Sequence, residues 1–301
     1  MTDTKLSCCV PAMSDASKAG TADVADIAVV RGVDASQMVA IPGGPFRMGC
    51  DRREGHPSDG EGPSRVVDVA AFRIDATTVS NARFARFAEA TGYRTEAERA
   101  GWSFVFGGLL PDDFEPTRGV ASAPWWRRVD GADWRHPEGP QSGIEARANL
   151  PVVHVSHNDA LAFCRWAGKR LPSEAEWEKA ARGGLENARF PWGNDETPDG
   201  QHRCNVWQGT FPSDNTLGDG FYSLAPVDAL LPNGFGLHNM VGNCWQWCAD
   251  WFDDGIHRAM RGGSYLCHPS YCWRYRNAAR SAATPDSTTG HIGFRCAADP
   301  D

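Results

Sequence analysis

The second half of the sequence carries almost no helical periodicity, and this constrains the fold more than any other feature. After residue 184 the chain is dominated by Gly, Pro, Asn, Asp and Trp, which favour turns and ordered loops. The 301 residues include 32 Gly, 20 Pro and 12 Trp, so tight turns and large anchoring side chains take the place of long helices. We therefore expect a chain of short strands and ordered loops, low in regular secondary structure.

Three short helices interrupt this pattern. The first is predicted to begin at a Ser80/Asn81 cap, to repeat Phe84 and Phe87 on one face, and to end at Gly92. The other two begin with capping pairs and end at glycines: Ser156 with Asp159 before Gly168, and Ser173 with Glu176 before Gly183.

The regions before and between these helices are less regular. Residues 1–33 resemble a mobile leader, and residues 34–301 are expected to form a single domain. The run at 38–51 places apolar residues around Pro-Gly-Gly and predicts a hairpin, and 65–80 predicts a strand that leads to a helix cap. The segment 101–148 is loop-like, and its four tryptophans suggest a functional surface.

Charge and hydropathy exclude several classes of function. A net charge of −8 gives no reason to expect nucleic acid or an anionic membrane as a partner. The sequence contains no membrane span and no apolar stretch of the length that a secretory signal requires, so we expect a cytoplasmic location. Ten cysteines in a reducing compartment favour thiol or metal chemistry over a disulfide scaffold.

Cys267 and Cys272 are the cysteines whose spacing raises a question of chemistry. Pro269 lies between them and removes a backbone donor, so both cysteines should lie on a loop, before a strand-like segment at 272–281. Two soft thiolates suit low-coordinate Cu(I) better than tetrahedral zinc, and His268 could be a third ligand. The spacing alone leaves a structural pair, a metal site and a catalytic pair open.

Two other patterns have ordinary explanations beside their functional ones. His154 and His157 form an HxxH, but the first lies in an apolar run and the second precedes a helix. The loop 205–223 is rich in Asn and Asp, which suits either Ca²⁺ or turns stabilised by Asx hydrogen bonds. Phosphate-binding loops, dinucleotide fingerprints and serine-hydrolase elbows are absent from the sequence.

Several segments taken in order closely resemble the formylglycine-generating enzymes, also called sulfatase-modifying factors. They are IPGGPFRMG, PVVHVSHNDALAFCRWAGKRLPSEAEWEKAARGG, NVWQGTFP, NGFGLHNMVGNCWQWCADWF, RGGSYLCHPSYCWRYRNAARS and TPDSTTGHIGFRC. The resemblance runs from about Val39 to the C-terminus. It implies a single irregular α/β domain of the α+β kind, with the fold related to C-type lectins.

The resemblance also implies an activity. The family oxidises a cysteine in a Cys-x-Pro-x-Arg segment of a sulfatase to Cα-formylglycine, using copper, O₂ and a thiol reductant. By position, Cys267 and Cys272 would bind Cu(I), and the substrate thiol would join them in place of His268. Ser264 and Tyr271 would line the oxygen and substrate pocket. Trp245 would form its wall, and Arg274 would assist there.

Two structural calcium sites are implied by the same resemblance. The first would use Asn205, the Val206 carbonyl, Asp219 and the Phe221 carbonyl. The second would use Asn239, Gly242, Cys244 and Gln246. The family commonly has Glu at the last of these positions, and Gln246 supplies only a neutral oxygen, which should weaken divalent binding.

Other departures leave further alternatives open. Cys164 and Cys296 occupy the positions of one disulfide of some eukaryotic relatives, although the expected cytoplasmic location disfavours a bridge. A non-catalytic, lectin-like module that binds a peptide or glycan is the main functional alternative. An iron-dependent sulfoxide synthase is another, but the leader lacks the helical, His-rich domain of that class. We expect a monomer.

Overall fold

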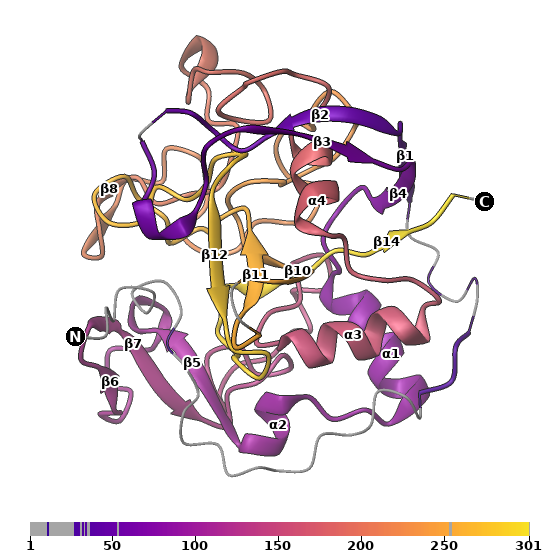
Figure 1. Ribbon diagram of the computed structural model, residues 1–301. Coiled ribbons are helices and arrows are strands. Elements are labelled where there is room, and N and C mark those ends of the chain that lie inside the picture. The colour runs from indigo at the N-terminus through magenta and orange to yellow at the C-terminus, as the bar shows by residue number, and fades with distance from the viewer. Residues whose placement is uncertain are drawn as a thin grey trace.

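The computed structural model describes residues 11, 27–30, 32, 34, 37–52, 54–252 and 255–300. Its helices are α1 (Asn81–Thr91), α2 (Glu96–Ala100), α3 (His157–Trp166) and α4 (Glu174–Ala181). Its strands are β1 (Met38–Ile41), β2 (Gly44–Met48), β3 (Arg65–Val69), β4 (Phe72–Asp75), β5 (Trp102–Phe106), β6 (Gly119–Val120), β7 (Ala123–Asp130), β8 (Gly209–Thr210), β9 (Asp214–Asn215), β10 (Trp245–Trp251), β11 (Arg258–Arg261), β12 (Arg280–Ala283), β13 (Ile292–Gly293) and β14 (Ala297–Ala298). Short 3₁₀ turns are η2 (Pro57–Asp59), η3 (Gly107–Leu109) and η4 (Pro198–Gly200). This mixture of few helices, short strands and long ordered connections confirms the predicted fold class (Figure 1).

The three helices predicted from sequence are confirmed. Ser80, Ser156 and Ser173 each accept a hydrogen bond from the backbone of the first turn, and the last two form complete capping boxes. Phe84 and Phe87 of α1 are fully buried, as their spacing predicts. The short helix α2 has its own capping box, and the sequence analysis missed it.

The predicted hairpin at 38–51 is wrong. β1 pairs with β4 and β2 pairs with β3, in one continuous antiparallel register in which Ile41 faces Phe72 and Gly44 faces Val69. The two halves therefore form one long ribbon that bends at the Pro-Gly-Gly segment instead of reversing there. Gly43 allows the bend, because a Cβ at that position would lie 2.8 Å from the backbone nitrogen of Ala71.

The segment 101–148 is more regular than its composition suggests. β5 pairs with β7 along its whole length, and β6 pairs with the other side of β7. All five residues of β5 are buried, so the loop assignment for this part was wrong. The tryptophans Trp102, Trp126 and Trp134 are buried anchors, whereas Trp125 stays partly exposed.

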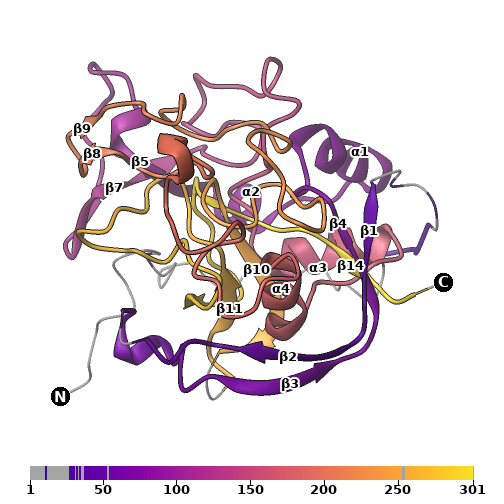
Figure 2. The same ribbon diagram turned by 90° about the horizontal axis from the view of Figure 1, so that it is seen from above.

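A four-stranded sheet in the order β12-β11-β10-β13 lies at the centre of the fold. Helix α4 contacts both this sheet and the β2–β3 ribbon, so it packs between them (Figures 1 and 2). β14, near the C-terminal end, joins the other edge of β4 and so connects the end of the chain to the ribbon. The main apolar core runs through these layers and includes residues from β1 to Cys296.

The structure describes the N-terminal end of the predicted domain only in part. Of the two residues at the predicted 33/34 boundary the structure describes only Asp34, and most of the predicted leader lies outside the described residues. Within the described part, the backbone nitrogen of Val30 donates to the carbonyl of Trp166, so contacts with α3 begin upstream of that boundary. Among the described residues, helices are too short and too polar to cross a lipid bilayer.

Candidate active site

The two cysteines of the central motif lie together on a buried loop. After β11, Gly262 and Gly263 adopt positive φ values of 98° and 73°, which turn the chain away from the sheet into this loop. Cys267 and Cys272 are each 1% exposed, neither forms a disulfide, and their Sγ atoms lie 2.7 Å apart. The predicted loop position of both cysteines is confirmed, and the loop brings their sulfurs together.

Backbone hydrogen bonds hold the pair in place. The Cys267 carbonyl accepts a hydrogen bond from the Trp207 backbone at 3.0 Å, and the Cys272 nitrogen donates to the His268 carbonyl at 3.0 Å. The Ser264 backbone nitrogen points at the Cys267 sulfur from 3.4 Å. The loop therefore places one backbone N–H within hydrogen-bond distance of the Cys267 sulfur. The strand expected to follow Cys272 starts only at β12, so that prediction was placed too early.

Ser264 precedes the pair in sequence, Tyr271 lies between the two cysteines, and both residues shape the same loop. The Tyr271 hydroxyl donates to the Leu266 carbonyl, and its ring stacks on Phe211 with centroids 4.2 Å apart. Trp125 meets the Tyr271 ring edge-on at 5.4 Å. Because all three rings are only partly buried, they form an aromatic surface next to Cys272. Ser264 is buried, and its Oγ accepts from the Leu266 nitrogen at 3.3 Å.

Arg274 is held by a carboxylate from a distant part of the chain. Its Nε donates to Asp59 Oδ2 at 2.6 Å and its Nη2 donates to Asp59 Oδ1 at 3.1 Å, and both side chains are buried. His56, in the same loop as Asp59, has its Nε2 3.1 Å from the Cys272 carbonyl. The loop 54–63 therefore contacts the chain at Cys272 and Arg274, and the predicted role of Arg274 in the reaction stays a prediction.

Trp245 is the first residue of β10 and is fully buried. It belongs to the same apolar core as both cysteines, and its indole nitrogen has no hydrogen-bond partner among the described residues. Its core position is thus certain, whereas its role as the wall of a substrate pocket stays a prediction.

The histidines do not complete a metal site. His268 Nδ1 is 2.8 Å from Ser270 Oγ, and the described part of the chain brings no three His, Cys, Asp or Glu side chains together in metal-binding geometry. His154 lies between Ser103 and the Pro137 carbonyl, and His157 contacts the Cys248 carbonyl. Two thiols without a third side chain fit low-coordinate Cu(I), with room in the coordination sphere for an incoming thiol.

The first predicted calcium site fits a divalent cation. Asp219 supplies a carboxylate that already receives the backbone nitrogens of Val206 and Phe221, each at 3.0 Å. Asn205 Oδ1 is buried without a partner among the described residues, as an acceptor that awaits a cation would be. The half-buried Gln208 amide donates to the Val206 carbonyl and to Asp219, so an ion bound here would replace this donor.

The second predicted calcium site does not fit a cation. The side-chain NH₂ of Gln246 donates to the carbonyl oxygens of Asn239 and Met240, so a donor points where an ion would need oxygen ligands. Gly242 lies against the backbone of Asn205, and Cys244 is a buried free thiol. These four residues include no carboxylate.

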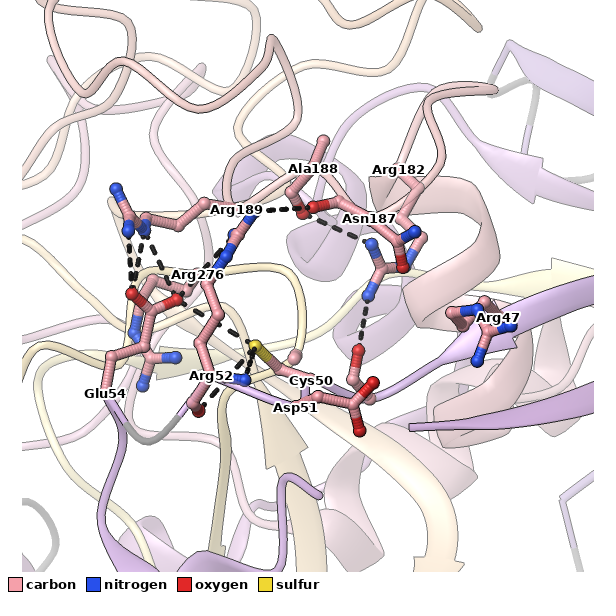
Figure 3. Close-up of a pocket in the computed structure, with 12 residues that line it drawn as sticks. Arg47, Cys50, Asp51, Arg52, Glu54, Arg182, Asn187, Ala188, Arg189 and Arg276 are labelled. Carbon is pink, nitrogen blue, oxygen red and sulfur yellow. Dashed lines mark hydrogen bonds and ion pairs between the residues drawn. The ribbon is translucent and has the colours of Figure 1, made fainter. Parts of the chain in front are cut away.

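Two open clefts lie beside the cysteine loop. One has a volume of about 460 Å³ and is lined by Arg47, Cys50, Arg52, Glu54, Arg189 and Arg276, among others (Figure 3). Its charges are largely matched: Arg189 pairs with Glu54, and Arg276 pairs with Glu61. The other, of about 600 Å³, shares Cys50 with the first and reaches His56, next to Cys272.

Sequence reasoning missed the residues that fix the cysteine loop from outside. Asp59 and His56 lie more than 200 positions before their partners, and Phe211 lies 60 before Tyr271, so no local pattern indicates them. Cys164 and Cys296, by contrast, are adjacent as the resemblance implies, with their sulfurs 3.6 Å apart and unbridged.

Comparison with known proteins agrees with this geometry. Residues 26–300 match the family described as sulfatase-modifying factor enzyme 1-like domain. A formylglycine-generating enzyme of Thermomonospora curvata is 56% identical over 286 residues, which cover 88% of this chain and 94% of the relative. An inactive C-alpha-formylglycine-generating enzyme 2 of Bos taurus is 47% identical over 267 residues, 86% of this chain and 87% of the relative.

Solved structures support the same assignment. PvdO from Pseudomonas aeruginosa superposes with a TM-score of 0.64 at 26% identity, covering 89% of this chain and 96% of that one. The lectin-like fold class implied by the sequence is therefore confirmed. The chain belongs to the sulfatase-modifying factor family, and its relatives include formylglycine-generating enzymes.

Proposed function

We propose that this protein converts a cysteine of a sulfatase to Cα-formylglycine, with Cu(I) held by Cys267 and Cys272 and with O₂ as the oxidant. The observation that carries the proposal is the pair of buried free thiols 2.7 Å apart. The relatives named formylglycine-generating enzyme support the conversion of a sulfatase cysteine to formylglycine.

The overall chemistry balances with one external reductant. A substrate CH₂–SH group, O₂, two electrons and two protons yield CHO, H₂S and H₂O, and a thiol supplies the electrons by forming its disulfide. Copper, when bound, would supply the electron chemistry that activates O₂. The chain's own residues bind and orient the substrate and exclude water from the reacting centre.

The neighbours of the thiol pair suit these tasks. Tyr271, Phe211 and Trp125 present a partly exposed aromatic surface on which an extended peptide containing proline can pack. Ser264 and the buried backbone around it border the sulfur of Cys267. The Arg274–Asp59 ion pair and the His56 contact keep the loop from shifting as substrate binds. A Cys-x-Pro-x-Arg segment is the proposed substrate, and one Ca²⁺ bound by Asn205, Val206, Asp219 and Phe221 is the proposed structural ion.

The experiment that tests the proposal measures the product directly. Copper-loaded protein is incubated with a Cys-x-Pro-x-Arg peptide, O₂ and a thiol, and the peptide is analysed by mass spectrometry. We expect the mass loss that corresponds to replacement of CH₂SH by CHO, and its absence without O₂. Cys50→Ser is the matched control for the serine variants of Cys267 and Cys272. Cys50 is a free, partly exposed cysteine outside the loop, so its replacement should leave turnover unchanged.

A non-catalytic binding module is the second candidate function. A relative named inactive shares 47% identity, so membership of the family does not by itself establish catalysis. This candidate predicts peptide binding and no aldehyde after copper loading. A cytoplasmic location and a monomeric state stay predictions.

A further inference from the structure

Gln246 lies at the centre of a fully buried polar network, at the place where a second calcium ion would be expected. The side chain is 0% exposed and extends from β10 towards the loop that precedes this strand. We infer that this network takes the place of a cation, so that the chain binds no calcium at 239–246, and that the single change Gln246→Glu opens the site to one Ca²⁺.

The orientation of the Gln246 amide is fixed by two donors. Its Oε1 accepts from Trp177 Nε1 at 2.9 Å and from Arg295 Nε at 2.7 Å. An indole N–H and a guanidinium can only donate, so the atom that they meet must be the amide oxygen. A flipped amide would place NH₂ against both donors and is excluded on that ground.

The amide NH₂ must then point the other way. It donates to the carbonyl oxygens of Asn239 at 2.9 Å and Met240 at 3.3 Å. Gly262 packs against the same group, because a Cβ there would lie 2.7 Å from the Met240 carbonyl and 3.5 Å from Gln246 Nε2. A calcium ion would have to displace this donor from a space without room for it to turn aside.

The network also contains a positive charge of its own. Arg295 is 0% exposed, and its other donors reach the backbone carbonyls of Asp75 at 3.0 Å and His238 at 2.8 Å. A guanidinium stays protonated in proteins, so this side chain brings a positive charge into the network. A divalent ion beside this guanidinium would need a carboxylate to offset the repulsion, and residues 239, 242, 244 and 246 include none.

One observation favours a bound ion at 239–246, but it concerns a single ligand atom. Asn239 Oδ1 is buried without a hydrogen-bond partner among the described residues. Calcium takes six to eight oxygen ligands, so one neutral acceptor does not make a site. The site at Asn205 differs from this one in its charge and in its competing donor. It has the Asp219 carboxylate, and the Gln208 amide that competes with an ion there is only half buried.

Replacing the Gln246 amide by a carboxylate removes the buried donor and supplies the negative charge that the site lacks. In Gln246→Glu one carboxylate oxygen would still accept from Trp177 and Arg295. The other would face the carbonyls of Asn239 and Met240, and oxygens at hydrogen-bond distance repel one another unless a cation lies between them. The variant should therefore be less stable than wild type in chelator and should regain stability when calcium is added.

The test counts calcium in the full-length protein. Wild type, Asp219→Ala, Gln246→Glu and the double variant are stripped with chelator, dialysed against calcium and analysed by elemental mass spectrometry. Asp219→Ala removes the carboxylate of the other site, so it should bind no calcium, and the double variant should bind one ion per chain. Gln141→Glu, which adds the same charge at an exposed position, should add no ion.

Two results would overturn the inference. One is a calcium ion bound in Asp219→Ala, or two ions in wild type, because either is an ion more than the Asn205 site accounts for. The other is a folded Gln246→Glu protein that binds no more calcium than wild type. If Gln246→Glu does not fold, the counts for wild type and Asp219→Ala still decide the first half. The counts need no turnover, so they are independent of the proposed function.

Discussion

The ion pair between Arg274 and Asp59 offers a quantitative test of how the cysteine loop is held. The two side chains are 4% and 0% exposed and share two hydrogen bonds of 2.6 and 3.1 Å. Asp59→Asn keeps the size of the side chain but removes the negative charge that Asp59 places against the buried guanidinium. Breaking one partner of a buried pair costs about 3–5 kcal/mol, so we expect a loss of that size in the free energy of unfolding.

The magnitude distinguishes a buried pair from a surface one. Asp130→Asn is the matched control, because Asp130 lies 3.5 Å from Arg128 with its side chain 84% exposed, and such pairs contribute about 0–1 kcal/mol. Replacing both buried partners by apolar residues, Asp59→Leu with Arg274→Met, should cost less than Asp59→Asn alone. The assay is urea unfolding followed by fluorescence and circular dichroism. A loss below about 1 kcal/mol in Asp59→Asn, equal to that in the control, would refute the reasoning.

Three further predictions concern the rest of the fold. Burial lowers the pKa of His154 to about 4 and of His157 to about 3, so each contributes stability that is present above pH 6.5 and lost as pH falls towards 4. At pH 5.5 each should lower the free energy of unfolding by about 1.4 kcal/mol relative to pH 7.5 in urea unfolding, and His157→Gln should shift the difference between the two pH values by about 1.4 kcal/mol in favour of pH 5.5; a difference equal to that of wild type would contradict this assignment. Gly43→Ala should lose about 1–3 kcal/mol by overpacking against Ala71, whereas Gly119→Ala, whose nearest contact is an ordinary 3.5 Å, should be near neutral, and equal effects in thermal unfolding would argue against the bend at Gly43. Tyr271→Phe should lower the free energy of unfolding by about 0.5–1.5 kcal/mol, because it loses the hydroxyl hydrogen bond but keeps the ring stack on Phe211. A clearly larger loss in the same unfolding assay would contradict this account of the hydroxyl.

The parts of the fold that were predictable are those whose cause is local. Ser80, Ser156 and Ser173 begin helices because each hydroxyl accepts a hydrogen bond from the backbone N–H three residues later. This contact depends only on neighbouring residues and not on the path of the rest of the chain. Pro269 similarly predicts that Cys267 and Cys272 lie on a loop.

The parts that were missed depend on partners far along the chain. Pro-Gly-Gly at 42–44 is a good turn sequence, but β1 and β2 find their partners at 65–75, and pairing with them bends the segment without reversing it. The same holds for the site: nothing near Arg274 indicates Asp59, which lies 215 positions earlier. Gln246 stands out in sequence as a departure from the family pattern, but which way its amide faces is decided by Trp177 and Arg295 from two other segments.

A copper titration tests the central claim most directly. Reduced protein is titrated with Cu(I) against a chromophoric chelator, in wild type, Cys267→Ser, Cys272→Ser and Cys50→Ser. Because the two sulfurs lie 2.7 Å apart and neither has a third side-chain ligand among the described residues, each should be needed for binding. We predict one Cu(I) per chain in wild type and Cys50→Ser and none in either loop variant. Full Cu(I) binding that survives in Cys267→Ser or Cys272→Ser would contradict the account.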